Sequence, residues 1–261
     1  MTRTLPALLC VQASILLDVA CAQTPAPESR GLEIATEVDR FNAGYESEIS
    51  RMEMVLINAR GDRMVRRMST KMRETEGDGD QSVMTFEWPA DVKGTRLLTW
   101  GHLERDDDQW LYLPSLHRVR RISSRSRSGA FMGSEFAFED LGSREVEKYE
   151  HGYLRDEMIE GRATWVTEQV PRDERSGYRR QIVWTDQEYH APIKIEFYDR
   201  KNELLKTMLF SDYGRYGRWF RPGRIDVENH QTAKRSILTW QERRLGAKLD
   251  DDEFESENLG D

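Results

Sequence analysis

Hydrophobic and polar residues alternate along most of this chain, a pattern typical of β-strands with one face turned toward a core. In residues 83–88, for example, Met84, Phe86 and Trp88 fall on the same face. Pro89 ends this run, because proline cannot donate a hydrogen bond to a neighbouring strand. Further predicted strands are residues 48–57, 64–72, 97–100, 110–113, 158–170, 178–185, 193–198, 204–213, 219–227 and 236–244.

One of these runs fits two kinds of structure. Met64, Met68 and Met72 lie four residues apart, which places them on one face of either a helix or a strand. The turn signal at residues 58–61, immediately before them, favours a strand. Ahead of all the strands, residues 31–45 predict an amphipathic helix, because apolar residues recur at three- and four-residue spacing.

Short turns connect the predicted strands and indicate a single antiparallel domain over residues 31–261. The strands number about ten or eleven, which is more than a flat open sheet holds comfortably. We therefore expect a mainly β fold whose sheet curls strongly.

The first 22 residues have the organisation of a secretory signal peptide. Arg3 supplies a short basic region, residues 5–17 are mostly apolar, and Ala20 and Ala22 have the small side chains of a cleavage site. We expect cleavage after Ala22, followed by a proline-containing linker at residues 23–30. A buried N-terminal helix is the alternative, since the apolar run is too short to span a bilayer.

Cys10 and Cys21 are the only cysteines of the chain, and both lie in this first segment. After cleavage the mature chain would have no thiol, and therefore no disulfide and no cysteine-based metal site or nucleophile. Cys21 can alternatively be a lipid-attachment site, because Ala20 precedes it, although Asp18 stands where an apolar residue is expected.

Composition narrows the classes of function. Hydrophobic residues make up 38% of the chain and charged residues 33%, so enough apolar side chains remain for a core. The formal net charge of -8 argues against a nucleic-acid partner. No two of the five histidines lie three to five residues apart, and no nucleophile elbow or phosphate-binding glycine loop occurs. We therefore predict no metal site, no cofactor and no enzymatic activity.

The stretch from residue 109 to residue 141 organises the chain. It begins as an apolar and aromatic strand, continues as an arginine-rich ribbon, and closes with a glycine-bounded aromatic segment. The ribbon arginines Arg118, Arg120 and Arg121 fit a solvated strand face. They also fit a basic patch that meets lipid head groups or an acidic partner.

The ten methionines of the chain leave the nature of the interior open. Methionine adapts to irregular ligands, so a cavity for acyl chains would have this composition. Stripes of methionine and aromatic residues at a period of two are also the ordinary content of a packed core. From the residues alone, a cavity for acyl chains and a packed core are equally compatible with the sequence.

The central stretch resembles the signature of the LolA-like outer-membrane lipoprotein-sorting proteins of Gram-negative bacteria. The resemblance is carried by WLYLP at residues 110–114, RVRRI at 118–122 and FMGSEFAFEDL at 131–141. Two flanking pieces agree with it, PADVKGT at 89–95 and YHAP at 189–192.

This resemblance implies a monomeric carrier in the periplasm. Its sheet would form an incomplete barrel covered by a few short helices, and its apolar concave side would shelter the acyl chains of a lipoprotein or lipid bound for the outer membrane. An RND-type exporter would be a partner. Two alternatives remain, a non-carrier adaptor of an envelope exporter and, if Cys21 is lipidated, a receptor anchored in the outer membrane.

The resemblance also suggests roles for individual side chains. We expect Arg118, Arg120 and Arg121 to dock a partner. The residues expected to contact acyl chains are Met84, Phe86, Trp88, Trp100, Trp110, Tyr112, Phe131, Phe136 and Phe138. Which face of each strand lines the cavity depends on register, because a shift of one residue exchanges the two faces.

Overall fold

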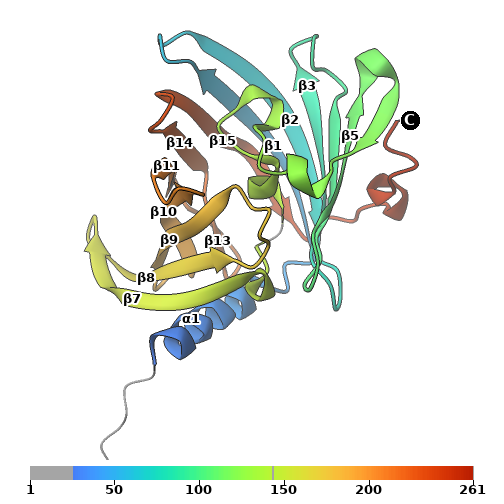
Figure 1. The fold of residues 1–261 in the computed structure, drawn as a ribbon. Coiled ribbons are helices and arrows are strands. Elements are labelled where there is room, and N and C mark those ends of the chain that lie inside the picture. Colours follow the sequence, from blue (N-terminus) through green and yellow to red (C-terminus); the bar gives the residue numbers. More distant parts are fainter. Residues whose placement is uncertain (1–25, 143, 261) are drawn as a thin grey trace, which may run out of the picture.

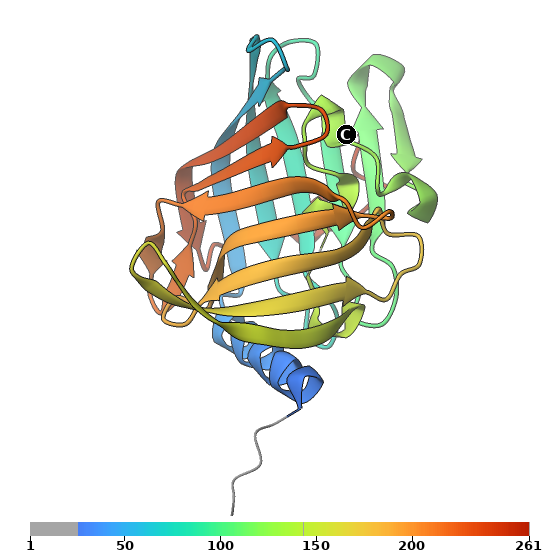
Figure 2. The ribbon, with the colours of Figure 1, turned by 60° about the vertical axis from the view of Figure 1, so that its left-hand side comes forward.

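The computed structural model describes residues 26–142 and 144–260. Thirteen strands form one antiparallel sheet that bends round on itself without closing (Figures 1 and 2). The order of strands across the sheet is β6-β5-β4-β3-β2-β1-β15-β14-β11-β10-β9-β8-β7. The predicted signal peptide, its cleavage site and Cys21 lie outside the described residues.

Most strands pair with the next strand in sequence through a tight turn, as the alternating pattern predicts. The strands of the large sheet are β1 (Ser47–Ile57), β2 (Arg63–Arg73), β3 (Gln81–Trp88), β4 (Arg96–Trp100), β5 (Asp108–Leu113), β6 (Arg118–Arg121), β7 (Tyr149–Ile159), β8 (Arg162–Pro171), β9 (Tyr178–Asp186), β10 (Ala191–Asp199), β11 (Leu204–Ser211), β14 (Arg224–Asn229) and β15 (Lys234–Leu245). A separate hairpin is formed by β12 (Gly214–Tyr216) and β13 (Trp219–Arg221).

Two connections give the sheet its shape. The chain leaves β6 at one edge and crosses to β7 at the opposite edge through residues 122–148. The last strand, β15, pairs with β1, so the first and second halves of the sheet meet in its middle. The crossing segment contains the aromatic part of the signature and runs along the concave side, where Phe131 and Phe136 join the core.

The structure confirms the mainly β class and corrects the number of strands. The predicted strand at residues 158–170 contains a turn, because Glu160 and Gly161 both have positive φ and reverse the chain between β7 and β8. The predicted strand at residues 219–227 divides between β13 and β14. Most of β7 was not predicted, because its exposed side chains do not alternate regularly with buried ones.

The core lies on the concave side of the sheet and includes part of the crossing segment. Phe131 is 0% exposed and Phe136 is 4% exposed, and both belong to the same cluster as Met54, Phe86 and Val227 of the strands. We call residues 129–141 the plug, because their side chains fill this part of the concave side.

Among the described residues there is one α-helix, α1 (Pro27–Asn42), which packs on β7 below the sheet (Figure 1). It spans Pro27 to Asn42 rather than the predicted residues 31–45. A Cβ on Gly31 would lie 2.8 Å from the backbone of Gly152, so the helix approaches β7 where neither residue has a side chain. No described helix is long and apolar enough to cross a bilayer. The 3-10 turns are η1 (Pro114–Leu116), η2 (Ser124–Ser126), η3 (Phe131–Gly133), η4 (Phe138–Leu141), η5 (Val146–Lys148) and η6 (Asp251–Phe254).

The C-terminal segment covers the convex face of β3, β4 and β5. Phe254 and Leu259 are buried there against Val83 and Leu98. The indole Nε1 of Trp100 donates a 2.7 Å hydrogen bond to the carbonyl oxygen of Phe254. Both faces of this part of the sheet are therefore apolar and covered, the concave face by the plug and the convex face by the C-terminal segment.

Candidate functional site

An apolar cavity of about 330 Å³ lies between α1 and the second half of the sheet. The helix contributes Ile34, Ala35 and Val38, which its 3.6-residue period places on the face toward the sheet. The other apolar residues of the lining are Val146, Val183, Ala191, Pro192, Ile195, Phe210, Phe220 and Pro222. The volume is at the lower end of the range for small-molecule sites, and such sites are mostly apolar.

Polar contacts at one end of α1 hold the helix over this cavity. Asn42 donates a 2.7 Å hydrogen bond to the carbonyl oxygen of His190, whose ring stacks on Phe41 with the centroids 4.2 Å apart. The Nε2 atom of His190 lies 3.1 Å from a carboxylate oxygen of Glu37. The helix is therefore fixed to the turn between β9 and β10 by side chains that separate if the helix swings outward.

The structure brings five of the expected acyl-contacting residues together in the packed core. Phe86, Phe131 and Phe136 are buried there, and Met84 and Phe138 pack against the same cluster. The ring of Phe131 lies 5.7 Å from that of Phe86 and 5.4 Å from that of Phe138. None of the five lines the cavity under α1.

The structure places the remaining four expected residues elsewhere. Trp100, Trp110 and Tyr112 are on the convex face, beneath the C-terminal segment, because they alternate with Leu97, Leu111 and other concave-face residues. Trp88 is 47% exposed, and a β-bulge in its pairing with β2 places its ring 5.6 Å from the guanidinium of Arg67. An alternating pattern shows that a strand has two faces, but it does not show which part of the protein covers each face.

A buried ion pair fastens the plug to the sheet. The side chains of Lys206 and Asp140 form this pair and are only 2% and 4% exposed. Lys206 also donates a 2.9 Å hydrogen bond to the carbonyl oxygen of Glu135, and the Tyr178 hydroxyl donates a 2.8 Å bond to Asp140. Because these charges are out of contact with water, removing either one would leave the other buried without a partner and would destabilise the plug.

Further hydrogen bonds hold the plug along its length. Arg66, which is 8% exposed, donates to the carbonyl oxygen of Met132, and Gln109 donates a 3.0 Å bond to that of Phe138. Glu139 accepts hydrogen bonds from the Ser176 hydroxyl at 2.8 Å and from the backbone N–H of Gly177 at 3.0 Å. Burial raises the pKa of Glu139, and these two donors offset part of that effect.

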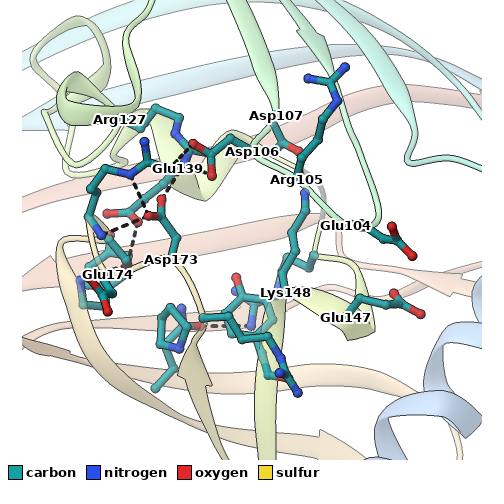
Figure 3. Close-up of a pocket in the computed structure, with 18 of the residues that line it drawn as sticks. Glu104, Arg105, Asp106, Asp107, Arg127, Glu139, Glu147, Lys148, Asp173 and Glu174 are labelled. Carbon is teal, nitrogen blue, oxygen red and sulfur yellow. Dashed lines mark hydrogen bonds and ion pairs between the residues drawn. The ribbon is translucent and has the colours of Figure 1, made fainter.

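A second pocket, of about 480 Å³, adjoins the plug and is lined mainly by charged residues (Figure 3). On one side, Arg127 bridges Asp106 at 3.0 Å and Asp173 at 2.7 Å, and Arg175 joins the same two carboxylates. On the other side, Lys148 is paired with Asp107. These pairs tie together the β4–β5 and β8–β9 loops, which approach each other across the mouth of the curled sheet.

The acidic run at residues 106–108 is accordingly a set of ion-pair partners. Asp108 contacts Arg105 at 2.9 Å and also Arg121, and these guanidinium groups hold the pKa of Asp108 below its usual range although burial acts in the opposite direction. Within residues 26–142 and 144–260, no group of three or more His, Cys, Asp or Glu side chains is arranged to hold a metal ion.

A buried carboxyl group lies where the end of α1 meets the sheet. Asp80 accepts a 2.7 Å hydrogen bond from the Tyr45 hydroxyl. Burial, with the nearby Glu74 and Asp39 carboxylates, raises the pKa of Asp80 to about 6, although the Tyr45 bond and the Arg221 charge act against it. Burial likewise lowers the pKa of Arg221, which donates a 2.6 Å hydrogen bond to Asn42.

The titration of Asp80 predicts a change of stability with pH. Its folded-state pKa of about 6 lies above the ordinary value of 3.8, so the folded protein binds this proton more tightly than the unfolded chain. The stabilisation that comes from the protonated Asp80 carboxyl is fully present below pH 4. It is lost as the pH rises toward 6, which lowers the free energy of unfolding by about 2–3 kcal/mol. Asp80→Asn removes this loss while still accepting the Tyr45 hydrogen bond.

Urea unfolding of the wild type and Asp80→Asn at pH 4.5 and 7.5 measures this effect. The variant is expected to gain stability relative to the wild type as the pH is raised. A stability difference for Asp80→Asn that is constant with pH would show that the carboxyl group titrates normally.

The arginine ribbon forms β6, a strand at the edge of the sheet. All four residues of β6 are exposed, and the neighbouring Leu116 is 60% exposed. Arg121 is paired with Asp108, whereas Arg118 and Arg120 form no ion pair with any described residue. The ribbon therefore projects two uncompensated positive charges beside an exposed apolar side chain.

Three features of the site were not predicted from the sequence. The cavity under α1 is lined by five residues of the helix and by one to three residues from each of several distant elements, so no single stretch of sequence reveals it. The partner of Asp140 was also missed, although the run Leu204-Leu205-Lys206-Thr207-Met208 places a lysine among apolar residues in a strand. The anchoring role of Arg66 had a weaker signal, since it stands between Val65 and another arginine in a strand with many charges.

Comparison with known proteins identifies relatives that share this architecture. A family model described as an uncharacterized protein matches residues 78–261. A domain assigned as an outer membrane lipoprotein-sorting protein from Vibrio parahaemolyticus is 45% identical, with a TM-score of 0.88 over 90% of this chain and 100% of that one. No functionally curated protein matches the chain.

Two further solved structures share the fold. A DUF1329 family protein from Desulfovibrio piger is 28% identical, with a TM-score of 0.85 over 90% of this chain and 100% of that one. The LolA superfamily protein NE2245 from Nitrosomonas europaea is 22% identical, with a TM-score of 0.69 over 86% of this chain and 97% of that one. The 45% identity over the full length of the Vibrio domain shows that the chain belongs to the same family of outer membrane lipoprotein-sorting protein domains, and its open sheet has the fold of the LolA superfamily protein.

Proposed function

We propose that the protein is a periplasmic carrier that binds an acyl chain of a lipoprotein or lipid and delivers it toward the outer membrane. The observation that carries this proposal is the apolar cavity between α1 and the sheet, in a chain of a lipoprotein-sorting family. Each methylene moved from water into such a cavity stabilises the complex by about 0.8 kcal/mol. Binding of this kind requires no covalent step.

The cavity limits how much cargo fits without movement. A volume of about 330 Å³ suits part of a single acyl chain rather than several chains. More room would come from the plug, because Phe131 and Phe136 occupy the concave side next to Met84 and Phe86. In this proposal, Met84, Phe86, Phe131, Phe136 and Phe138 contact cargo only when the plug moves aside. Trp88, Trp100, Trp110 and Tyr112 do not face this space.

We propose that the edge strand β6 meets the partner that loads or receives the cargo. Arg118 and Arg120 are exposed and unpaired among the described residues, and Leu116 and Val119 are 60% and 39% exposed beside them. Such a surface complements an acidic patch with an apolar centre on a partner protein, for example an RND-type exporter. Arg121 contributes less charge, since Asp108 already pairs with it.

Ala35→Trp tests the cavity directly. Ala35 lines the cavity from α1, and an indole at this position would occupy much of the space that an acyl chain needs. We expect the affinity for a fluorescent fatty acid to fall by about tenfold or more, which corresponds to roughly 1.4 kcal/mol. Titration followed by fluorescence, and native mass spectrometry of protein purified from the periplasm, measure this loss.

Leu32→Trp is the matched control, because Leu32 is 50% exposed on the same helix and lies outside the cavity lining. It should bind the fatty acid as the wild type does. If the wild type binds no acyl chain by either method, or if both tryptophan variants bind equally well, the cavity is not the cargo site.

One observation favours a second function, that of an adaptor which docks an exporter without carrying cargo. The plug is closely packed and is held by a buried ion pair, so the largest apolar part of the concave side is already filled. An adaptor would keep the β6 surface but would purify without bound lipid.

A further inference from the structure

The apolar cavity and the charged pocket are neighbours that share a wall. Arg144 and Tyr149 line both of them. The short turn η5 lies along the same boundary, with Val146 on the apolar side and Glu147 and Lys148 on the charged side. The two spaces therefore adjoin at these residues, and the lining changes from apolar to charged within a few residues of the boundary.

Arg144 stands at the point where this change occurs. Its guanidinium donates hydrogen bonds to Gln169, which lines the apolar cavity, at 2.7 Å, and to Gln181, which lines the charged pocket, at 3.0 Å. It also lies 5.5 Å from the ring centroid of Tyr149. Both hydrogen-bond partners are neutral amides, and Arg144 forms no ion pair with a described carboxylate. Its positive charge is thus positioned but not neutralised.

The charged pocket also contains carboxylates that are not neutralised. Glu104 and Glu147 lie on the side of the pocket opposite the network of Arg127, Asp106 and Asp173 (Figure 3). Among the described residues, neither glutamate forms an ion pair or a side-chain hydrogen bond. The charged pocket therefore offers one exposed positive group, Arg144, and two exposed negative groups, Glu104 and Glu147, that form no ion pair with described residues.

We propose that the charged pocket receives the zwitterionic head group of the amphiphile whose acyl chain lies under α1. This inference rests on the proposed carrier function and names the class of its ligand. Arg144 would bind the anionic phosphate adjoining the chain, because guanidinium groups form strong charge-assisted hydrogen bonds with phosphate oxygens. Glu147 and Glu104 would face a terminal ammonium group. A phosphoethanolamine head joined to one acyl chain has this order of charges.

Three single-chain amphiphiles with the same acyl chain test the proposal. They carry a phosphoethanolamine head, an anionic phosphoglycerol head, or an uncharged glycerol head. The wild-type protein is expected to bind the first about tenfold more tightly than either of the others. Competition with a fluorescent fatty acid gives the three affinities at one salt concentration.

Two variants assign the head-group contacts separately. In Arg144→Gln, the preference for phosphoethanolamine over the uncharged glycerol head should fall, because the phosphate loses its partner. In Glu147→Gln, the preference for phosphoethanolamine over phosphoglycerol should fall, because the ammonium loses its partner. Arg179→Gln removes one positive charge at an exposed position outside both spaces and should leave all the ratios unchanged. Thermal unfolding of each variant confirms that it is folded.

The outcomes separate this inference from the carrier proposal. Equal binding of all three amphiphiles, abolished by Ala35→Trp, would overturn the head-group pocket and leave the acyl cavity standing. Tighter binding of the amphiphile with the phosphoglycerol head would likewise contradict the proposal that the pocket prefers a zwitterionic head group. Absence of binding by every amphiphile would overturn both proposals.

Discussion

Replacement of Asp140 by alanine is expected to lower the free energy of unfolding by about 3–5 kcal/mol. The substitution leaves the ammonium group of Lys206, which is 2% exposed, without its carboxylate partner. The ammonium group keeps its 2.9 Å hydrogen bond to the carbonyl oxygen of Glu135 and the rings of Tyr178 and Phe197, 5.2 and 5.0 Å away, and none of these neutral groups can replace a carboxylate. Urea unfolding at neutral pH measures the loss.

A second substitution shows whether Asp140→Ala destabilises the protein because Lys206 loses its partner or because the carboxylate's other contacts are lost. In Asp140→Ala combined with Lys206→Met, no buried charge remains, and we expect most of the lost stability to return. Asp62→Ala is the control, since it breaks only exposed contacts, with Arg60 and Asn58, and should cost less than about 1 kcal/mol. If the double variant is as unstable as Asp140→Ala alone, the carboxylate acts through its bonds to Tyr178 and Ala137 instead.

Phe131→Ala is expected to cost about 3–5 kcal/mol and to release the plug. The ring is fully buried between Phe86 and Phe138, so its removal leaves a cavity at the centre of the concave side. Hydrogen exchange should show residues 129–141 losing protection before the strands of the sheet do. If this plug is the movable part of a carrier, the variant should also bind acyl chains with more carbon atoms than the wild type accepts.

Phe131→Met serves as the control for Phe131→Ala, because methionine fills a similar volume and should cost less than about 1.5 kcal/mol. Loss of protection throughout the sheet, with no earlier change at residues 129–141, would contradict a plug that opens on its own. It would show instead that the plug and the sheet unfold as one unit.

The class of fold and the importance of residues 109–141 could be predicted from the sequence. Which face of each strand points toward the concave side could not. Alternation predicts that two faces differ when one meets solvent. In β4 and β5 both faces are buried, so Leu97 and Leu111 face the plug while Trp100, Trp110 and Tyr112 face the C-terminal segment. Two apolar faces of this kind cannot be told apart by periodicity.

The aromatic signature illustrates a second limit. Its residues resemble a cargo-binding surface by composition, and the structure uses them as the protein's own filling. What distinguishes the two is the set of polar anchors, Arg66, Tyr178 and Lys206, which stand far from the signature in sequence. Only their arrangement in space shows that Asp140 is buried as one member of a charge pair.

The open edge of the sheet has a consequence for the behaviour of the protein in concentrated solution. The outer side of β6 presents backbone donors and acceptors that no neighbouring strand satisfies, and such an edge can template fibrils. Three of its four residues are arginine. Two molecules that approach edge to edge therefore repel each other, and the ribbon protects the protein from aggregation whether or not a partner is present.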